Sequence, residues 1–153
     1  MPTSSTLSRH KTEESANHCF GCGELNPQGL HLHFALDASN PEAITASTTV
    51  RLTKIHQGPP GCVHGGIIAT LLDEAMSKVN RAFGVIAMTR NMEVDYLRPV
   101  PLEAELTIVG HHVRRDGRKI FNTAEILGQE GKVLAQAKGL FVVVDPALIT
   151  GRR

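Results

Sequence analysis

The stretch HGGIIATLLDEA, residues 64–75, combines residue types that could take part in catalysis. Two glycines, Gly65 and Gly66, precede an apolar stretch of helical period, and two carboxylates, Asp73 and Glu74, lie within it. The first N–H groups of a helix have no intrahelical partner, and glycine lets a ligand oxygen approach them closely. We therefore predict an oxyanion-type site at the two glycines, where the Gly66 N–H polarises a carbonyl group, as in acyl transfer.

Helical periodicity separates the two carboxylates. Glu74 lies one turn before Lys78, and an i to i+4 ion pair explains it without any function. Asp73 lies on the flank between the apolar and polar faces, beside Ala69 and Ser77, with no basic residue one turn away. A carboxylate at such a boundary costs stability unless its charge is used. We therefore expect Asp73 to act as a general base or a nucleophile.

Asp73 and Gly66 cannot act on one small group within a single chain. Seven residues at a rise of 1.5 Å place them about 10 Å apart along the helix axis. If two copies pack with antiparallel helices across a two-fold axis, Gly66 of one copy approaches Asp73 of the other. The motif thus predicts a homodimer with shared active sites, and we keep open its further pairing into a homotetramer. From the motif alone, glycines that merely end a loop and a merely solvated Asp73 also stay open.

The spacing of Cys19 and Cys22 is that of a metal half-site or a redox pair. A structural zinc ion needs about four ligands, and the remaining ones would have to come from His18, His31, His33 or Cys62. The pair also leads into turn residues rather than a βα unit, which disfavours a redox role. We expect a compact turn here, with no metal and no cofactor.

The elements that position these residues follow from sequence periodicity. A helix is predicted from Gly65 to about Phe83, after a loop over residues 53–63 that contains two glycines and two prolines. Asp116-Gly117 and residues 129–131 are typical of tight turns between strands. Strands are predicted over residues 31–37, 44–52, 86–97, 102–114, 119–128 and 133–144. One long helix wrapped by a curved, mostly antiparallel sheet of about six strands is an α+β fold.

Length and charge narrow the possible functions. We expect residues 1–17 to be poorly ordered and residues 18–150 to form a single domain. With 16 Lys and Arg against 15 Asp and Glu, the net charge of +1 gives no case for nucleic acid or an anionic membrane as a partner. No apolar run approaches the roughly 20 residues of a membrane span, and the polar beginning has no signal-peptide core. We expect a cytoplasmic protein.

The stretches GPPGCVHGGIIATLLDEAM and MTRNMEVDYLRPVPL together resemble the hotdog-fold acyl-CoA thioesterases. Within that superfamily the chain is similar to the phenylacetyl-CoA and hydroxybenzoyl-CoA thioesterase group. Its arrangement of GPPG, VHGG and RPVPL most resembles the mitochondrial long-chain acyl-CoA thioesterase branch. The likeness extends from CFGCGELNPQGLHLHF to the final hairpin, and so covers nearly everything after Asn17.

The resemblance implies a role for particular residues. In such enzymes the catalytic carboxylate lies nine positions after the motif histidine. That histidine corresponds to His64 here, and the ninth position after it is Asp73. The Gly66 N–H would polarise the thioester carbonyl, and His64 would shape the loop, neighbour the thioester or only cap the helix. Thr89 matches the hydroxyl residue that positions water in the mitochondrial branch, whereas other branches have their polar helper where this chain has Asn91. A strand residue that only bonds its neighbours remains the alternative for both.

Coenzyme A carries phosphates, so an acyl-CoA substrate requires basic residues near the site. The candidates, each of which could equally be a solvated surface residue, are Arg98, Arg114, Arg115, Arg118 and Lys119. We also assign Val63 and Gly65 to the substrate-binding wall. Two other functions stay open: a non-catalytic acyl-CoA-binding hotdog protein, and a hotdog enoyl-CoA hydratase. The hydratase needs a histidine with Asp73, and the next ones along the chain are His111 and His112.

Overall fold

The computed structural model describes residues 18–149, so the segment expected over residues 1–17 lies outside the described residues. The chain divides into two compact units, Met1–His33 and Phe34–Arg153. The expectation of a single domain over residues 18–150 stays a prediction.

The described part of the first unit is a series of turns. The Gly23 N–H donates to the Cys19 carbonyl at 2.8 Å, and the Leu30 N–H donates to the Phe20 carbonyl at 2.8 Å. The compact turn expected around Cys19 and Cys22 is therefore present.

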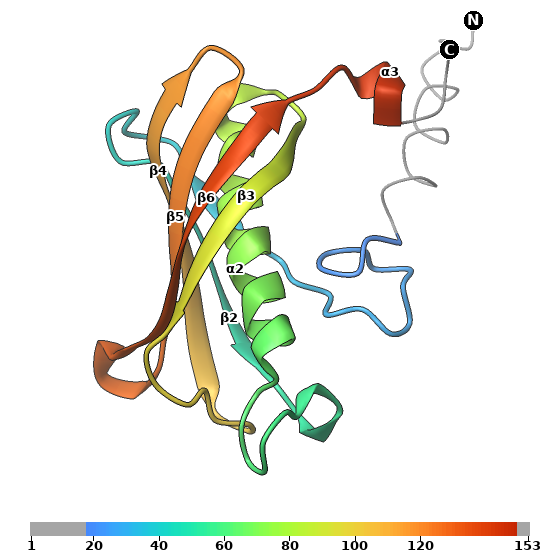
Figure 1. Cartoon of the computed structure of the whole chain (residues 1–153), viewed down its shortest axis with the longest axis vertical. Helices are drawn as coiled ribbons and strands as arrows, with labels where there is room; N and C mark the ends of the chain where they lie inside the picture. Colours follow the sequence, from blue (N-terminus) through green and yellow to red (C-terminus); the bar gives the residue numbers. More distant parts are fainter. Residues whose placement is uncertain (1–17, 150–153) are drawn as a thin grey trace, which may run out of the picture. The chain divides into compact units, whose positions relative to one another are not determined.

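The second unit contains one six-stranded sheet and one long helix (Figure 1). The strands are β1 (Ala35–Asp37), β2 (Thr45–Arg51), β3 (Ala87–Tyr96), β4 (Glu105–Asp116), β5 (Lys119–Leu127) and β6 (Val133–Val143). The helical elements are α2 (Gly65–Val79), α3 (Pro146–Ile149) and the 3-10 turns η1 (Lys54–His56), η2 (Asn80–Phe83) and η3 (Gln129–Gly131). The strand order is β1-β2-β4-β5-β6-β3, and each of these pairings is antiparallel. The predicted α+β layout is confirmed.

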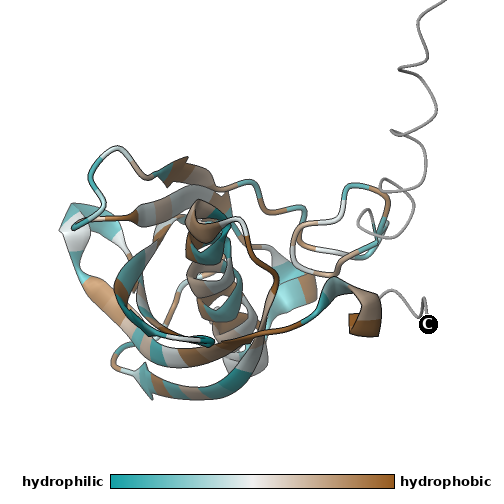
Figure 2. Ribbon diagram, turned by 90° about the horizontal axis from the view of Figure 1, so that it is seen from above, coloured by the Kyte–Doolittle hydropathy of each residue, from teal (hydrophilic) through white to brown (hydrophobic). Residues whose placement is uncertain are grey.

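The sheet curves around α2, which lies in its hollow (Figure 2). The buried apolar residues of the helix are Ile68, Leu71, Leu72, Ala75, Met76 and Val79. Two glycines of the sheet let the helix come close. A Cβ on Gly110 would overlap the carbonyl of Ala75, and a Cβ on Gly139 would lie 2.8 Å from the Met76 sulfur. Close packing against β4 and β6 therefore fixes the position of α2.

A buried polar group ties the end of the helix to the sheet. Asn122, which is 1% exposed on β5, donates to the Met76 carbonyl at 2.9 Å and to Asn80 Oδ1 at 2.8 Å. Its own oxygen lies 3.0 Å from His112 Nδ1. Met76 is in the last turn of α2, where carbonyl groups lack intrahelical partners, so Asn122 satisfies one of them.

The first predicted strand is shorter in the structure than its sequence pattern indicated. Only Ala35–Asp37 pairs with β2, whereas the prediction began at residue 31. His31 has a φ of 49°, in the left-handed region, and its ring bonds the Asn26 carbonyl at 2.5 Å. A residue in this left-handed conformation interrupts the extended backbone, so the alternating residues around it do not form a strand.

Among residues 18–149, no helix is long and apolar enough to cross a membrane.

Candidate active site

Asp73, in the third turn of α2, contacts a side chain of the edge strand β3. Thr89 Oγ donates to Asp73 Oδ1 at 2.7 Å. Burial raises the pKa of the Asp73 carboxyl above its ordinary value, the Thr89 hydrogen bond partly offsets this, and the neighbouring charge of Glu74 adds to it. A half-buried carboxylate with a raised pKa accepts a proton more readily than an exposed aspartate does, because it is more basic.

A β-bulge separates Thr89 from Asn91. In the pairing of β3 with β6, Thr89 lies opposite Phe141 and Asn91 lies opposite Leu140, so Arg90 is an extra residue. Residues directly opposite each other point to the same face, and Phe141 is fully buried toward the helix. Thr89 therefore faces α2, while Asn91 faces away from it. The structure brings only Thr89 to Asp73.

His64 caps the start of α2. The Gly66 N–H donates to His64 Nδ1 at 2.9 Å, and the Ile68 N–H donates to the His64 carbonyl at 3.1 Å. Because Nδ1 accepts this bond, it carries no proton. A thioester oxygen that bonds the Gly66 N–H would have to share it with His64 or replace the imidazole.

The chain's own packing explains some glycines but not those at the helix start. A Cβ on Gly58 would lie 2.8 Å from the His64 Cα, so the fold excludes a larger residue there. On Gly65 a Cβ would meet only the Tyr96 ring, at an ordinary 3.6 Å, and on Gly66 only the movable His64 ring, at 3.2 Å. Neither glycine has a positive φ. No backbone group or positive φ among the described residues forces glycine at these two positions.

The loop that leads into α2 is held by backbone hydrogen bonds. The Val63 N–H donates to the Val100 carbonyl at 2.8 Å, and the His64 N–H donates to the His56 carbonyl at 2.8 Å. Val63 is 3% exposed, so its side chain packs inside the chain and supports the loop. Its expected place in a substrate-binding wall stays a prediction.

The sequence did not predict the contact of Tyr96 with the helix start, although Tyr96 lies in the motif MTRNMEVDYLRPVPL. Tyr96 lies opposite the buried Ala135 and so faces the helix, and its hydroxyl donates to the Gly65 carbonyl at 3.0 Å. The signal available was an aromatic residue with a polar tip on the strand that also carries Thr89.

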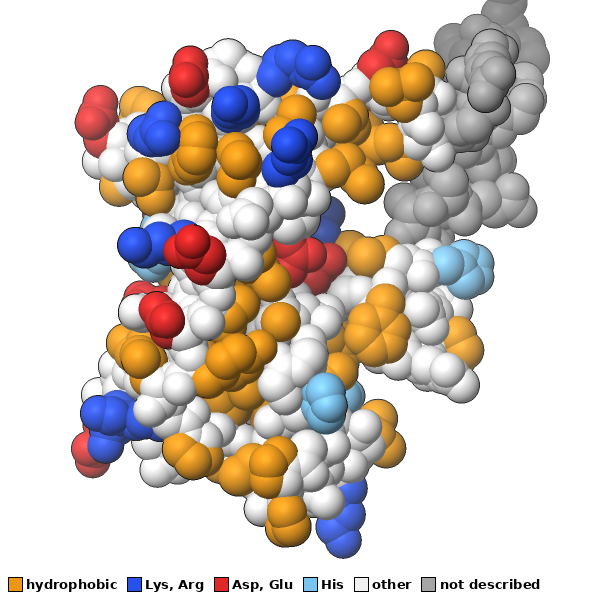
Figure 3. Space-filling view, in the orientation of Figure 1, with side chains coloured by type: hydrophobic (Ala, Val, Ile, Leu, Met, Phe, Trp, Pro, Cys, Tyr) orange, Lys and Arg blue, Asp and Glu red, His pale blue; other side chains and the backbone are white. Residues whose placement is uncertain are grey.

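The predicted basic residues do not converge on one point. Arg115 and Arg118 donate to the carbonyls of Gly117 and Val143, and the Arg114 guanidinium stacks 3.7 Å above the Phe121 ring. Arg118 lies in the β4–β5 turn and Lys119 follows it. This turn is at the end of the sheet where α2 ends, opposite the glycines (Figure 1). Lys and Arg side chains gather between hydrophobic ones at that end (Figure 3). Arg98 is exposed after β3, and its backbone N–H bonds the Leu134 carbonyl at 2.9 Å.

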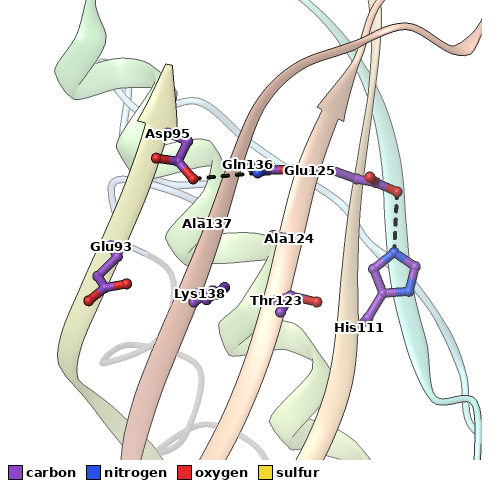
Figure 4. Close-up of a pocket in the computed structure, with 9 residues that line it drawn as sticks. All are labelled: Glu93, Asp95, His111, Thr123, Ala124, Glu125, Gln136, Ala137 and Lys138. Atoms are coloured by element: carbon purple, nitrogen blue, oxygen red, sulfur yellow. Dashed lines mark hydrogen bonds and ion pairs between the residues drawn. The ribbon is translucent and has the colours of Figure 1, made fainter. Parts of the chain in front are cut away.

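The two histidines that a hydratase would need have other partners. His112 bonds Asn122 in the core, and His111 Nε2 lies 3.5 Å from Glu125 Oε1. His111 and Glu125 border a hollow of about 290 Å³ on the face of the sheet that turns away from α2 (Figure 4). Neither histidine is placed to assist Asp73.

A family model and several relatives match the chain. The model of the thioesterase superfamily matches residues 60–135, which contain the helix start, Asp73 and Thr89. The acyl-coenzyme A thioesterase THEM4 of Rattus norvegicus is 37% identical over 91 residues, which are 59% of this chain and 39% of the relative. That of Mus musculus is 31% identical over 140 residues, 91% of this chain and 60% of the relative. The chain thus spans 39% to 60% of the length of these two curated relatives.

Solved structures share the fold. A crystallised thioesterase superfamily protein superimposes with a TM-score of 0.70 at 36% identity, over 82% of this chain and 60% of that one. A hypothetical thioesterase protein from Streptococcus pneumoniae TIGR4, solved with coenzyme A, has a TM-score of 0.64 at 22% identity, over 73% of this chain and 89% of that one. The predicted hotdog fold is confirmed, and the matched segment 60–135, which holds the helix start, Asp73 and Thr89, belongs to the thioesterase superfamily.

Proposed function

We propose that the protein is an acyl-CoA thioesterase, which hydrolyses the thioester of a fatty or aromatic acyl-CoA to a free acid and CoA. The observation that carries this proposal is a basic carboxylate, Asp73, held by Thr89 in a chain whose helix start keeps two glycines that its own packing does not require. The relatives named acyl-coenzyme A thioesterase and the similar fold solved with coenzyme A support the same activity.

The edge strand β3 offers a route to the shared site. Among the described residues this ten-residue strand pairs on one side only, with β6, and the unpaired backbone groups of an edge strand favour pairing with another strand. Antiparallel pairing of β3 with its copy creates a two-fold axis and places the two α2 helices antiparallel. Gly66 of one subunit then approaches Asp73 of the partner subunit. We propose this homodimer, and its further pairing into a homotetramer stays a prediction.

The proposed reaction begins when the Gly66 N–H and the positive end of α2 polarise the thioester carbonyl. Asp73 of the partner subunit accepts a proton from water, which attacks the carbonyl carbon, and Thr89 of the partner subunit orients that water. The C–S bond breaks, and the CoA thiolate leaves and takes up a proton. In the nucleophilic variant, the Asp73 carboxylate attacks the carbonyl carbon first, the C–S bond breaks as the CoA thiolate leaves, and water then hydrolyses the resulting mixed anhydride to the free acid and the Asp73 carboxylate.

The substrate's CoA portion requires contacts outside this centre. We propose that Gly65 and Val63 border the thioester, and that Arg98, Arg114, Arg115, Arg118 and Lys119 bind the phosphates. Asn91 faces the other side of β3, so we favour Thr89 as the residue that positions water. A cytoplasmic location stays a prediction.

Thiol release from a panel of acyl-CoAs with short, long and aromatic acyl groups tests the proposal. We expect turnover of at least one class. Binding of acyl-CoA without any turnover would support the non-catalytic binding protein instead. Addition of water to an enoyl-CoA, measured by the loss of its conjugated absorbance, would support the hydratase.

A further inference from the structure

Tyr96, the only tyrosine of the chain, lies against the first turn of α2. Its hydroxyl donates to the Gly65 carbonyl at 3.0 Å, and its ring lies 3.6 Å from the place of a Cβ on Gly65. The side chain is 55% exposed, so packing of the ring in a core does not explain this arrangement.

The Gly65 carbonyl belongs to the same peptide group as the Gly66 N–H. This group is planar because its electrons are delocalised over the oxygen, carbon and nitrogen atoms. A hydrogen bond to the oxygen draws electrons from the nitrogen and makes the N–H a stronger donor. Tyr96, the peptide group and His64 Nδ1 thus form one chain of hydrogen bonds, with lengths of 3.0 and 2.9 Å.

We infer that Tyr96 is a positioning residue, which fixes the plane of the Gly65–Gly66 peptide and strengthens the Gly66 N–H toward an oxyanion. This inference rests on the proposed function, because a thioester oxygen takes the acceptor place that His64 Nδ1 occupies. Negative charge on that oxygen then polarises the peptide further, and the Tyr96 hydroxyl stabilises the carbonyl as the peptide responds.

Strand β3 thereby controls both halves of the reaction. Thr89, near its beginning, bonds Asp73, and Tyr96, at its end, bonds Gly65. Both side chains face the helix although seven positions separate them, because the bulge at Arg90 changes the alternation. In the proposed dimer, one β3 strand holds the carboxylate of one site and the oxyanion donor of the other.

The substitution Tyr96→Phe removes the hydroxyl and keeps the ring. We expect kcat to fall on the order of tenfold, less than the hundredfold or more typical of losing a direct oxyanion donor. KM should stay within about twofold, because the interaction strengthens in the transition state. The amide proton of Gly66 should move upfield in NMR spectra, whether or not any substrate is present.

Replacing tyrosine by 3-fluorotyrosine during expression changes residue 96 alone and supplies a stronger hydrogen-bond donor. We expect kcat at or above that of the unmodified protein and a downfield shift of the Gly66 amide proton. A Tyr96→Phe variant with unchanged kcat and an unmoved Gly66 amide overturns the inference. A variant that loses both melting temperature and activity while the Gly66 amide proton keeps its chemical shift also overturns the inference, because Tyr96 would then only hold the helix start in place. If the unmodified protein hydrolyses no acyl-CoA, the proposed function fails, while the amide shifts still decide whether Tyr96 acts on Gly66.

Discussion

At the scale of single residues, Asp73 is a charged group in a place that disfavours charge. Burial of the carboxylate is the largest cause of its raised pKa, and the partner that bonds it, Thr89, contributes a neutral hydroxyl and no charge. Charged groups that lower stability in this way concentrate at functional sites. The alternative, an aspartate that is only solvated at the surface, gives no reason for burying the carboxylate.

The substitution Asp73→Asn should separate activity from stability. It keeps the size of the side chain and removes the charge, so we expect kcat to fall on the order of a hundredfold or more. The melting temperature at neutral pH should rise, because the variant no longer buries an ionised carboxylate. Asp145→Asn, at an exposed position after β6, keeps the side-chain oxygen that accepts from the Ala147 N–H, so it is the matched control and should change neither quantity appreciably. A fully active Asp73→Asn variant would exclude Asp73 from the chemistry.

The pH dependence follows from the same raised pKa. Asp73 must be ionised to act as base or nucleophile, so kcat/KM should fall on acidification at a pH above the ordinary aspartate pKa of about 3.9. Stability should change in the opposite sense. The contribution of Asp73 to the free energy of unfolding is fully present below its unfolded-state pKa and is lost as pH rises through its folded-state pKa. Glu74→Gln removes a charge that raises this pKa, and should therefore move the acid limb of the rate profile to lower pH. An acid limb that stays at the same pH in Glu74→Gln would assign it to a group other than Asp73.

At the scale of secondary-structure elements, local sequence patterns predicted the helix and the hairpins well, because each depends on neighbours in the chain. The period of the apolar residues predicted α2, and Asp116-Gly117 predicted the turn between β4 and β5. The bulge at Arg90 depends on the register between β3 and β6, which distant residues determine. For that reason the sequence left Thr89 and Asn91 as alternatives, and only the structure separates them. The shortened first strand has a local cause instead, because His31 adopts a left-handed conformation and its ring bonds the carbonyl of Asn26, five residues earlier.

Substitution by alanine should change stability in opposite directions at two glycines, Gly110 of β4, which packs against α2, and Gly66, in the first turn of α2. Gly110→Ala places a Cβ onto the Ala75 carbonyl, and should destabilise the fold by forcing α2 away from β4. Gly66→Ala meets only the His64 ring and improves helix propensity, by up to about 1 kcal/mol, so stability should hold or rise. Its kcat/KM should nevertheless fall, because the Cβ occupies the approach to the N–H. Denaturant unfolding combined with thiol-release assays checks both, and an equally destabilised Gly66→Ala variant would indicate a purely structural glycine.

At the scale of the whole molecule, the proposed active site has two halves that a single chain holds apart. Asp73 and Gly66 are separated by about 10 Å along one rigid helix, a distance that no side-chain rotation removes. A complete site forms only if a second chain supplies the missing half. The open edge of β3 and the unexplained glycines point to the same solution from two different elements.

Mixing two inactive variants tests the shared site directly. Asp73→Asn chains lack the carboxylate, and Gly66→Ile chains block the oxyanion donor with a bulky side chain. In a mixed dimer with cross-chain sites, one site carries both defects, and the other combines an intact Gly66 with an intact Asp73. Random exchange makes half of the dimers mixed, each with one good site of two, so activity should recover to about a quarter of the unmodified level. Subunit exchange is confirmed by differently tagged chains, and each variant mixed with itself is the control. If exchange is complete and activity remains at the level of the separate variants, the two halves of the site do not come from different chains.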